Sequence, residues 1–312
     1  ETASYGGLRD AVTGLPLTQR DGKYLAANDI HFPTTRDFGV DGKYTPVTIA
    51  SSDTDTIVPP DVNNAARAEV YRPLPGEAAK DVTVTVTITD SDSGVSASRS
   101  FLIAVQPLTQ QEIDAELALM AAVKAHYFDG IRNANTDAKN ILTDLHPFRE
   151  AYLDADGQLV WVYDHADLTG SGIVPVAMDG WTESEQWRLF RSTDPDVISH
   201  ENLLVTRAAG DKTVTVSSEL SSETLGKYAA RYPDNKDFQA LSCQPVSVEL
   251  TVPGTEPVTP TPVDPTPVEP DHKALSVTFQ LHTDTEMWIS PSVIGDLPES
   301  TTCLLYTSPS PR

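Results

Sequence analysis

Closely spaced carboxylates are the first residues in this chain that suggest chemistry. Asp154 and Asp156 alternate just before Gly157, as in a calcium loop, where carboxylate oxygens must converge on one hard cation. The register of an EF-hand loop would place Tyr152 and Tyr163 at its first and last ligand positions, which is a poor fit. We therefore favour a hairpin turn, for which Asp-Gly is a common sequence, and keep calcium as the alternative.

Other acidic pairs lie in turn-rich stretches and could bind calcium between domains: Asp53 and Asp55, Asp90 and Asp92, and Asp194 and Asp196. Solvated turn residues explain these pairs more simply, because Asp side chains commonly accept hydrogen bonds within turns. We keep Asp154, Asp156, Asp90 and Asp92 as the calcium candidates of the chain, and the sequence indicates no other cofactor.

Histidines stand beside carboxylates twice, in Asp164–Asp167 and at His200-Glu201. A catalytic or metal site needs several such groups with supporting partners, and no second motif completes one here. The sequence also lacks a nucleophile elbow, a His-Glu-x-x-His motif and a phosphate-binding loop. We expect no catalytic residues in this part of the protein, and hence no enzyme activity.

Four aromatic residues could form a flat platform for sugar rings: Trp161, Trp181, Trp187 and Tyr163. Large aromatic side chains also dominate protein cores. Packing inside the fold is the simpler interpretation of these residues, and a sugar platform is the alternative.

The composition limits the possible partners. The chain has 312 residues, 39% of them hydrophobic, and 22 basic against 45 acidic residues give a net charge of −23. Such a chain repels nucleic acid and anionic lipid surfaces, and no run of about 18 apolar residues suggests a membrane span. The two cysteines, Cys243 and Cys303, suggest no disulfide framework.

The clearest strand signal is the strict Val/Thr alternation of Val82–Ile88. A turn at Asp90–Gly94 and the apolar run Phe101–Val105 complete an antiparallel hairpin. Shorter strands are predicted at Val47–Ile49 and Val70-Tyr71. Short strands at this spacing predict a β-sandwich.

A helix is predicted directly after this sandwich. Thr109 and Glu112 form a capping box, and Leu108 and Ile113 are placed to form a hydrophobic staple around it. The apolar stripe that follows continues to about Phe128, where the helix should end.

The pattern of the first sandwich then returns in the same order. Asp29–Phe32 is echoed by Asp144–Phe148, Thr54–Ile57 by Pro195–Ile198, and Val70–Pro73 by Val205–Ala208. These anchors predict an internal repeat. The second copy carries an extra hairpin over Ala151–Tyr163 and a mainly helical segment around Ser218–Ala240, where the first copy has its tight turn.

These repeated anchors resemble the atrophied bacterial immunoglobulin-like domain, which occurs in tandem on surface proteins of Gram-positive, actinobacterial-type organisms. The resemblance covers roughly residues 28–252. Further on, Ser276–Leu281 and Trp288-Ile289 are similar to the start of a β-grasp-like domain related to the C-terminal domain of cobalamin carriers. The resemblance implies a mainly β fold of two immunoglobulin-like β-sandwich modules, the second elaborated with helices and a hairpin, plus a truncated third domain.

The domain boundaries follow from these patterns. Residues 1–27 are assigned to a preceding region, 28–107 to module 1, 108–252 to module 2, 253–272 to a linker and 273–302 to the truncated domain. The linker is rich in Pro and Thr, and its stretch Pro253–Pro270 favours an extended polyproline II spacer of roughly 56 Å. Residues 303–312 match translated adapter from transposon-based sequencing libraries, and we interpret them as an assembly artefact rather than a natural Ser/Pro tail.

The leading hypothesis is a non-catalytic piece of a secreted bacterial cell-surface or cell-wall protein, in which the modules act as a stalk or adhesion array. Its partners would be host or cell-wall glycans or proteins. The alternatives are an arm that presents a terminal small-molecule, corrinoid-like binding domain, and an accessory arm of an extracellular enzyme. Fold analogy alone cannot decide among them.

Overall fold

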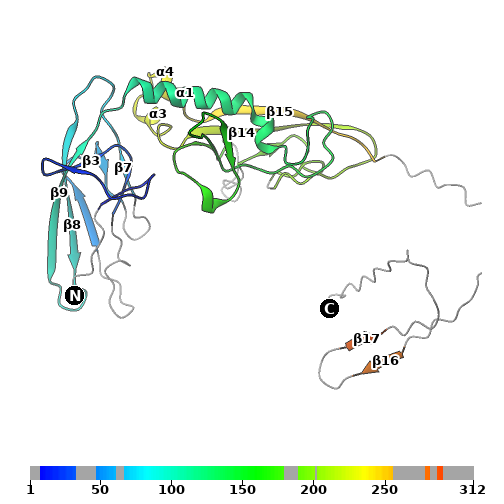
Figure 1. Cartoon of the computed structure of the whole chain (residues 1–312), viewed down its shortest axis with the longest axis horizontal. Coiled ribbons are helices and arrows are strands. Elements are labelled where there is room, and N and C mark those ends of the chain that lie inside the picture. The colour runs from blue at the N-terminus through cyan, green and yellow to red at the C-terminus, as the bar shows by residue number, and fades with distance from the viewer. Residues whose placement is uncertain are drawn as a thin grey trace, which may run out of the picture. The chain divides into compact units, whose positions relative to one another are not determined.

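Module 1 is built from two β-sheets in the computed structural model (Figure 1). The model describes residues 8–32, 47–60, 67–178, 189–200 and 202–255, and the backbone of 278–281 and 287–290. One sheet has the order β1 (Arg9–Asp10), β4 (Ile30–His31), β7 (Arg67–Val70), β6 (Ile57–Val58). The other has the order β2 (Gln19–Arg20), β3 (Lys23–Ala26), β9 (Ser96–Val105), β8 (Lys80–Thr89), β5 (Val47–Ser51).

The Val/Thr alternation forms the hairpin β8–β9, as predicted. Val82, Val84 and Val86 are buried between the sheets. On the opposite face, the intervening Thr hydroxyls pair across the strands, as Thr85 does with Ser100 at 2.9 Å. These cross-strand pairs extend β9 back to Ser96, five residues before the apolar run that predicted it.

Residues 8–26 belong to module 1, and not to a preceding region as predicted. β3 runs parallel to β9, with Tyr24 opposite Ile103, and β1 pairs with β4. Leu8 and Leu17 are buried in the same hydrophobic core as the β8 valines. The sheets of module 1 therefore start about twenty residues earlier than the repeat anchors suggest.

Module 2 contains a six-stranded sheet with β14 (Lys212–Ser222) at its centre. β14 pairs on one side with β15 (Gln244–Val252), and on the other with β12 (Ile173–Val176) and β13 (Arg191–Ser192). The predicted extra hairpin is present as β10 (Glu150–Leu153) and β11 (Leu159–Val162), and β10 joins it to β12. The fold is mainly β, as predicted.

Helices cover the buried face of this sheet. α1 (Gln110–Ala125) begins with the predicted capping box at Thr109. α1 ends at Ala125, before the predicted end near Phe128. The last residues of the predicted helix belong to a second helix, α2 (Tyr127–Ile131). α1 contacts β14 and α2 contacts β15, so in the described part of module 2 these helices occupy the layer that a second sheet fills in module 1.

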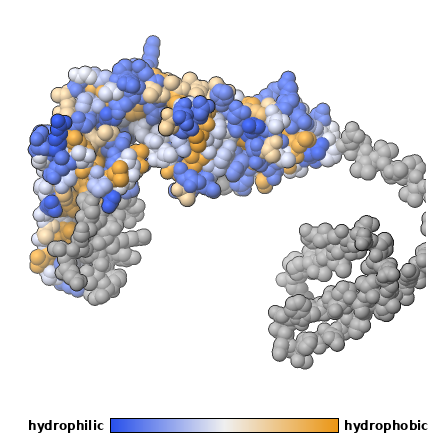
Figure 2. Space-filling view, viewed as in Figure 1, coloured by the Kyte–Doolittle hydropathy of each residue, from blue (hydrophilic) through white to orange (hydrophobic). Residues whose placement is uncertain are grey.

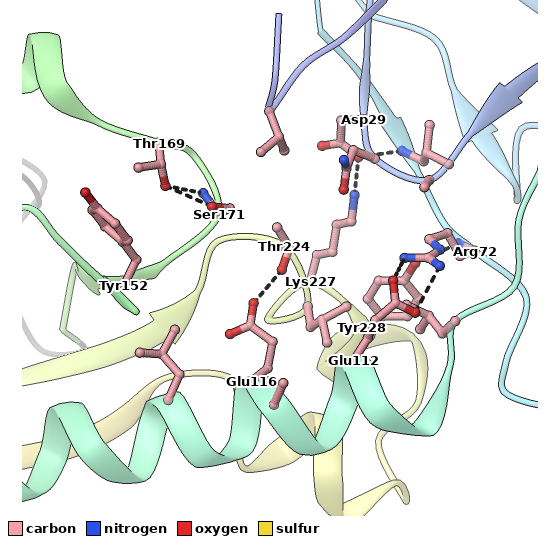
Figure 3. Close-up of a pocket in the computed structure, with 18 of the residues that line it drawn as sticks. Asp29, Arg72, Glu112, Glu116, Tyr152, Thr169, Ser171, Thr224, Lys227 and Tyr228 are labelled. Atoms are coloured by element: carbon pink, nitrogen blue, oxygen red, sulfur yellow. Dashed lines mark hydrogen bonds and ion pairs between the residues drawn. The ribbon is translucent and has the colours of Figure 1, made fainter. Parts of the chain in front are cut away.

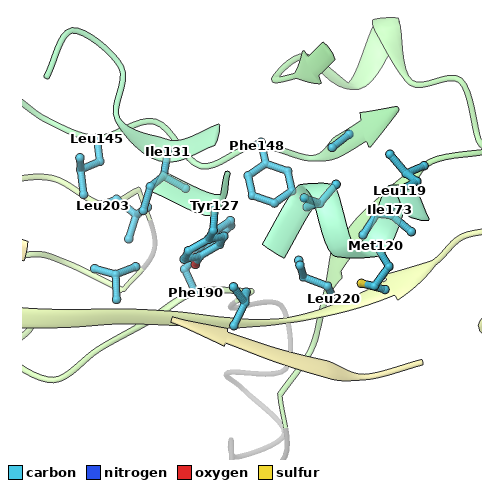
Figure 4. Close-up of a cluster of buried hydrophobic side chains, with 14 of the residues drawn as sticks. Leu119, Met120, Tyr127, Ile131, Leu145, Phe148, Ile173, Phe190, Leu203 and Leu220 are labelled. Carbon is cyan, nitrogen blue, oxygen red and sulfur yellow. The ribbon is translucent and has the colours of Figure 1, made fainter. Parts of the chain in front are cut away.

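The core of module 2 lies between these layers (Figure 4). Met120 from α1 and Tyr127 from α2 meet Leu220 of β14 and the ring of Phe148, which stands edge-on to Tyr127. Burial of such large apolar side chains is the main source of stability for the module. The sheet therefore depends on the helices for its hydrophobic cover.

The connection between β14 and β15 is helical in part, as predicted. β14 continues to Ser222, and two single-turn helices follow, α3 (Tyr228–Arg231) and α4 (Lys236–Gln239). In module 1 the equivalent connection is the tight turn between β8 and β9. This insertion places basic and aromatic residues next to module 1.

The chain divides into two compact units, Glu1–Pro257 and Val258–Arg312. In the second unit, β16 (Thr278–Leu281) and β17 (Met287–Ser290) pair as an antiparallel hairpin. Most of the predicted linker, the rest of the predicted third domain and the tail at 303–312 lie outside the described residues. Among the residues described, no helix is both long and apolar enough to cross a membrane.

Candidate functional site

The two modules repeat the same hydrogen bonds at equivalent residues. In module 1, the carboxylate of Asp29 accepts the backbone N–H of Val70 at 2.8 Å. In module 2, Asp144 accepts the N–H of Val205 at 2.7 Å. These are the anchors that the sequence comparison paired, so the internal repeat is present in the folded protein.

Matching turns also stand directly before the second pair of anchors, Thr54–Ile57 and Pro195–Ile198. Ser51 Oγ donates to the carbonyl of Asp53 at 2.9 Å and accepts its N–H at 3.2 Å. Ser192 makes the same two bonds with Asp194, at 3.1 and 3.2 Å. Side-chain bonds of this kind fix a turn locally and depend on no distant partner.

Each module also uses an arginine to hold the chain that leaves its last strand. Arg72 Nε and Nη2 donate to the carbonyl oxygens of residues 106 and 107 at 3.0 and 2.7 Å. Arg207 Nε and Nη2 donate to those of residues 253 and 254 at 2.9 and 2.8 Å. We call this arrangement the arginine clamp; it fixes the direction in which the chain leaves each module.

The clamp arginine of module 1, Arg72, also contacts module 2. Arg72 makes a two-pronged ion pair with Glu112 of α1, at 2.8 and 3.1 Å. Glu112 is also the acid of the capping box, and it accepts the backbone N–H of Thr109 at 2.7 Å. Burial raises the pKa of Glu112, but the hydrogen bonds from Arg72 and Thr109 outweigh burial and leave the pKa below its usual value. One carboxylate thus caps the helix and joins the modules.

Asp29 is the centre of a second set of contacts across the junction. Besides the N–H of Val70, its carboxylate binds Lys227 from the β14–β15 connection and Arg67 Nε at 2.9 Å. The side chain of Asp29 is only 7% exposed. Arg67 in turn reaches Glu223 of module 2 at 3.5 Å. Removing a cation from a carboxylate that is buried in this way would leave its charge uncompensated, which is strongly unfavourable.

Tyr71 forms the aromatic part of the junction. The guanidinium of Arg231 lies 3.6 Å from the centre of its ring, and Arg231 also donates to the carbonyl of Asp55. Tyr228 packs edge-on to Tyr71 at 5.5 Å, and its hydroxyl accepts the N–H of Arg72 at 2.6 Å. Burial raises the pKa of Tyr228 to about 12, so its hydroxyl stays protonated at neutral pH.

The calcium candidates lie in turns, and the carboxylates of Asp154 and Asp90 accept backbone N–H groups of these turns. Asp154 accepts the N–H groups of Asp156 and Gln158 at 3.0 and 2.8 Å. Asp90 accepts the N–H of Asp92 at 3.1 Å and that of the following serine at 2.7 Å. Among the described residues, no group of three or more His, Cys, Asp or Glu side chains is placed to hold a metal ion.

The other acidic pairs have local roles as well. Asp53 forms an ion pair with Lys80 at 2.5 Å, and the hydrogen bond from Lys80 is the largest cause of its lowered pKa. Asp55 contributes its carbonyl to the junction, through Arg231, and Asp194 shapes the turn described above.

The His–carboxylate pairs are not brought together. His200 Nδ1 accepts the N–H of Ser192 at 3.0 Å, which ties a loop to β13. His165 and Asp167 lie in the exposed short helix η1 (His165–Asp167), and Asp164 precedes it. Glu201 is outside the described residues.

Two of the four candidate platform aromatics take part in core packing. Trp161 packs edge-on against Phe148 at 4.7 Å, and its ring fills the space beside Gly130. Tyr163 donates to the carbonyl of Gly130 at 3.1 Å and stacks on His146 at 4.5 Å. Trp181 and Trp187 lie outside the described residues.

The sequence alone does not mark the junction as a site. Arg72 and Asp29 stand out in it as repeat anchors and Glu112 as a helix cap, but nothing in the sequence indicates their partners. Lys227, whose partner Asp29 lies 198 residues earlier, carries no local signal. One feature of the sequence does point to the junction: a capping box follows directly after the first copy of the repeat, so the two copies adjoin.

Comparisons with known proteins add little. No family model matches the chain, and no curated protein matches it. Among solved structures, the human protocadherin-24 EC1-2 pair is similar at 10% sequence identity and a TM-score of 0.18, covering 77% of this chain and 97% of that one. The fold described above rests on the strand pairing itself.

Proposed function

We propose that this chain is a non-catalytic part of a secreted bacterial cell-surface protein, in which modules 1 and 2 serve as a spacer within a stalk or adhesion array. The observation that carries the proposal is the junction. β9 ends at Val105 and α1 begins at Gln110, and the arginine clamp binds the carbonyls of residues 106 and 107 between them. The connection between the modules is therefore short, and Arg72 holds it in place through hydrogen bonds, as a spacer requires.

The contacts around the clamp support the same role. Asp29, Tyr71 and Arg72 of module 1 each bind residues of the β14–β15 connection or of α1. A single hinge bond would let the modules swing, whereas contacts from several elements fix both tilt and rotation. A spacer of this kind transmits position along the protein without a chemical step.

The charge of the chain suits a protein that works in an extended, soluble array. The net charge of −23 keeps neighbouring copies apart. On the face shown in Figure 2, hydrophilic residues cover most of the described surface and hydrophobic residues are scattered between them. The proposed partners of the array are glycans or proteins of a host or of the cell wall.

The proposal is tested by measuring the distance between the modules in the whole chain. Spin labels at position 98 of module 1 (Ser98→Cys) and at the native, exposed Cys243 of module 2, with Cys303→Ser, report this distance by double electron–electron resonance. A fixed spacer gives one narrow distance distribution. Lys227→Met, which removes a partner of Asp29, should broaden it, whereas Lys212→Met at the exposed start of β14 should not.

A broad distribution in the otherwise unchanged chain would show that the modules move independently, and the spacer proposal would fail. The same measurement on Lys212→Met controls for the loss of a lysine as such.

A further inference from the structure

A cavity of about 400 Å³ lies beside the junction, and both modules line it (Figure 3). Asp29 and Arg67 of module 1 are on one side. Tyr152, Ser171 and Thr224 of module 2 are on the others. Pockets that hold small molecules have volumes of about 300–1,000 Å³, so this cavity is large enough for a ligand of disaccharide size.

The accessible charges that line the cavity already have partners. Asp29 is bound by Lys227 and Arg67, and Arg72 is bound by Glu112 (Figure 3). An ionic ligand would have to break one of these pairs to find a counter-charge of its own. Asp29 is the buried charge among them, and taking a cation from it would leave that charge uncompensated, which is strongly unfavourable.

Glu116 does not offer a counter-charge either. Its Oε1 accepts the Thr224 hydroxyl at 2.9 Å, and its Oε2 is buried away from solvent with no hydrogen-bond partner among the described residues. Burial raises the pKa of this carboxyl, against the lowering effect of the hydroxyls of Thr224 and Ser222. Glu116 lines the cavity, but its burial disfavours the charged form that a cationic ligand would need.

The remaining lining consists of one amide, several hydroxyl groups and apolar side chains. The amide is that of Asn28, the hydroxyl groups are those of Tyr152, Thr169, Ser171, Thr224 and Tyr228, and Leu153 and Leu225 are among the apolar residues. Hydroxyl groups both donate and accept hydrogen bonds, and they match a ligand that also carries many hydroxyls. Aliphatic walls match the C–H faces of such a ligand.

We propose that this cavity is a binding site for a neutral carbohydrate of about two sugar units. The proposal goes beyond the spacer role, which requires no ligand. Because residues of both modules line the site, bound sugar would also hold the junction together.

The test uses the whole chain and three neutral disaccharides as probes: cellobiose, maltose and N,N′-diacetylchitobiose. Binding is followed by isothermal titration calorimetry, with glucosamine and glucuronate as charged comparisons. We expect at least one neutral disaccharide to bind, and the double variant Tyr152→Ala/Ser171→Ala to bind it about tenfold more weakly or worse.

The matched control is Thr87→Ala/Ser98→Ala, which removes a hydroxyl pair on the β8–β9 hairpin, outside the cavity. It should bind as the unchanged chain does, and the melting temperature of each variant shows that it is folded. The proposal is overturned if no neutral disaccharide binds, if the charged sugars bind equally well, or if both double variants lose affinity alike. None of these outcomes affects the distance measurement that tests the spacer.

Discussion

Modules 1 and 2 carry the same anchor residues, but the surroundings of these residues differ between the two modules. Asp29 and Asp144 make the same backbone hydrogen bond, and Arg72 and Arg207 make the same clamp. Asp29 is nevertheless buried, whereas Asp144 is exposed. The repeated fold thus supplies the anchors, and an adjoining module turns one set of them into an interface.

The residues around the anchors explain this difference. Tyr71, which holds Arg231 on its ring, is replaced by Thr206 at the equivalent place in module 2. Glu112 follows residue 107, the second residue of module 1 whose carbonyl is clamped, by five positions. Five positions after the equivalent residue 254 of module 2, the chain has Thr259. Module 2 therefore keeps the clamp without the acid and the aromatic ring that join module 1 to its neighbour.

The largest expected effect is that of replacing the clamp arginine at the junction. Arg72→Met removes two bonds to carbonyls and the ion pair to Glu112; the two carbonyls lose their donor, whereas Glu112 keeps its bonds from Thr109. We expect the free energy of unfolding to fall by about 3 kcal/mol in urea denaturation, mostly from the two unsatisfied carbonyls. Arg207→Met loses only the two carbonyl bonds at a more exposed place and should cost about 1–2 kcal/mol. Equal losses would mean that the junction adds nothing to the clamp.

The paired aspartates give the next largest effect. Asp29→Asn leaves Lys227 and Arg67 facing a neutral amide in a buried place, and should cost about 2–3 kcal/mol. Asp144→Asn keeps an oxygen to accept the Val205 N–H and should cost less than about 0.5 kcal/mol. Thermal unfolding of both variants checks the difference, and a costly Asp144→Asn would point to an unrecognised partner at the end of module 2.

A substitution at Gly130 tests how the elaboration of module 2 is packed. A Cβ at this helical position would lie 2.4 Å from the ring of Trp161, so Gly130→Ala should cost about 1–3 kcal/mol. Were the Trp161 ring able to swing out as a sugar platform, Ala would stabilise the helix by about 1 kcal/mol instead. The sign of the change in urea denaturation therefore separates packing from a movable platform.

A feature of this fold can be predicted from the sequence when the residues that determine it lie close together in the chain. The strand at Val82–Ile88 and the capping box at Thr109 are each set by neighbouring residues, and the repeated anchors are short stretches that recur in the same order. All of them appear in the structure. Strands β1 and β2 have two residues each, too few to show a period, so their place in module 1 was missed.

The site was harder to predict than the fold for the same reason. Lys227 and Arg231 lie in a connection whose helical turns are short, and their partners at Asp29 and Tyr71 are far away in sequence. Such contacts arise only when two modules meet, and nothing in local spacing records them. The acidic pairs, by contrast, looked like sites because they are close in sequence, although in the turns at Asp90 and Asp154 this closeness serves backbone hydrogen bonds.

The smallest expected effect concerns Glu116 and its dependence on pH. Burial raises the pKa of Glu116 above the value it has in the unfolded chain. Well below the pKa of the unfolded chain Glu116 is protonated in both states and costs no stability; as pH rises towards the folded-state pKa, the unfolded state ionises first and Glu116 lowers the stability of the fold. Glu116→Gln does not ionise, so it should be more stable than the unchanged chain at pH 7, and the difference should shrink as the pH is lowered towards 4. Glu249→Gln, an exposed position on β15, is the matched control and should change stability little at either pH. A Glu116→Gln variant that loses stability at pH 7 would show that the carboxylate is ionised and well paired, and would reopen the cavity beside it to a charged ligand.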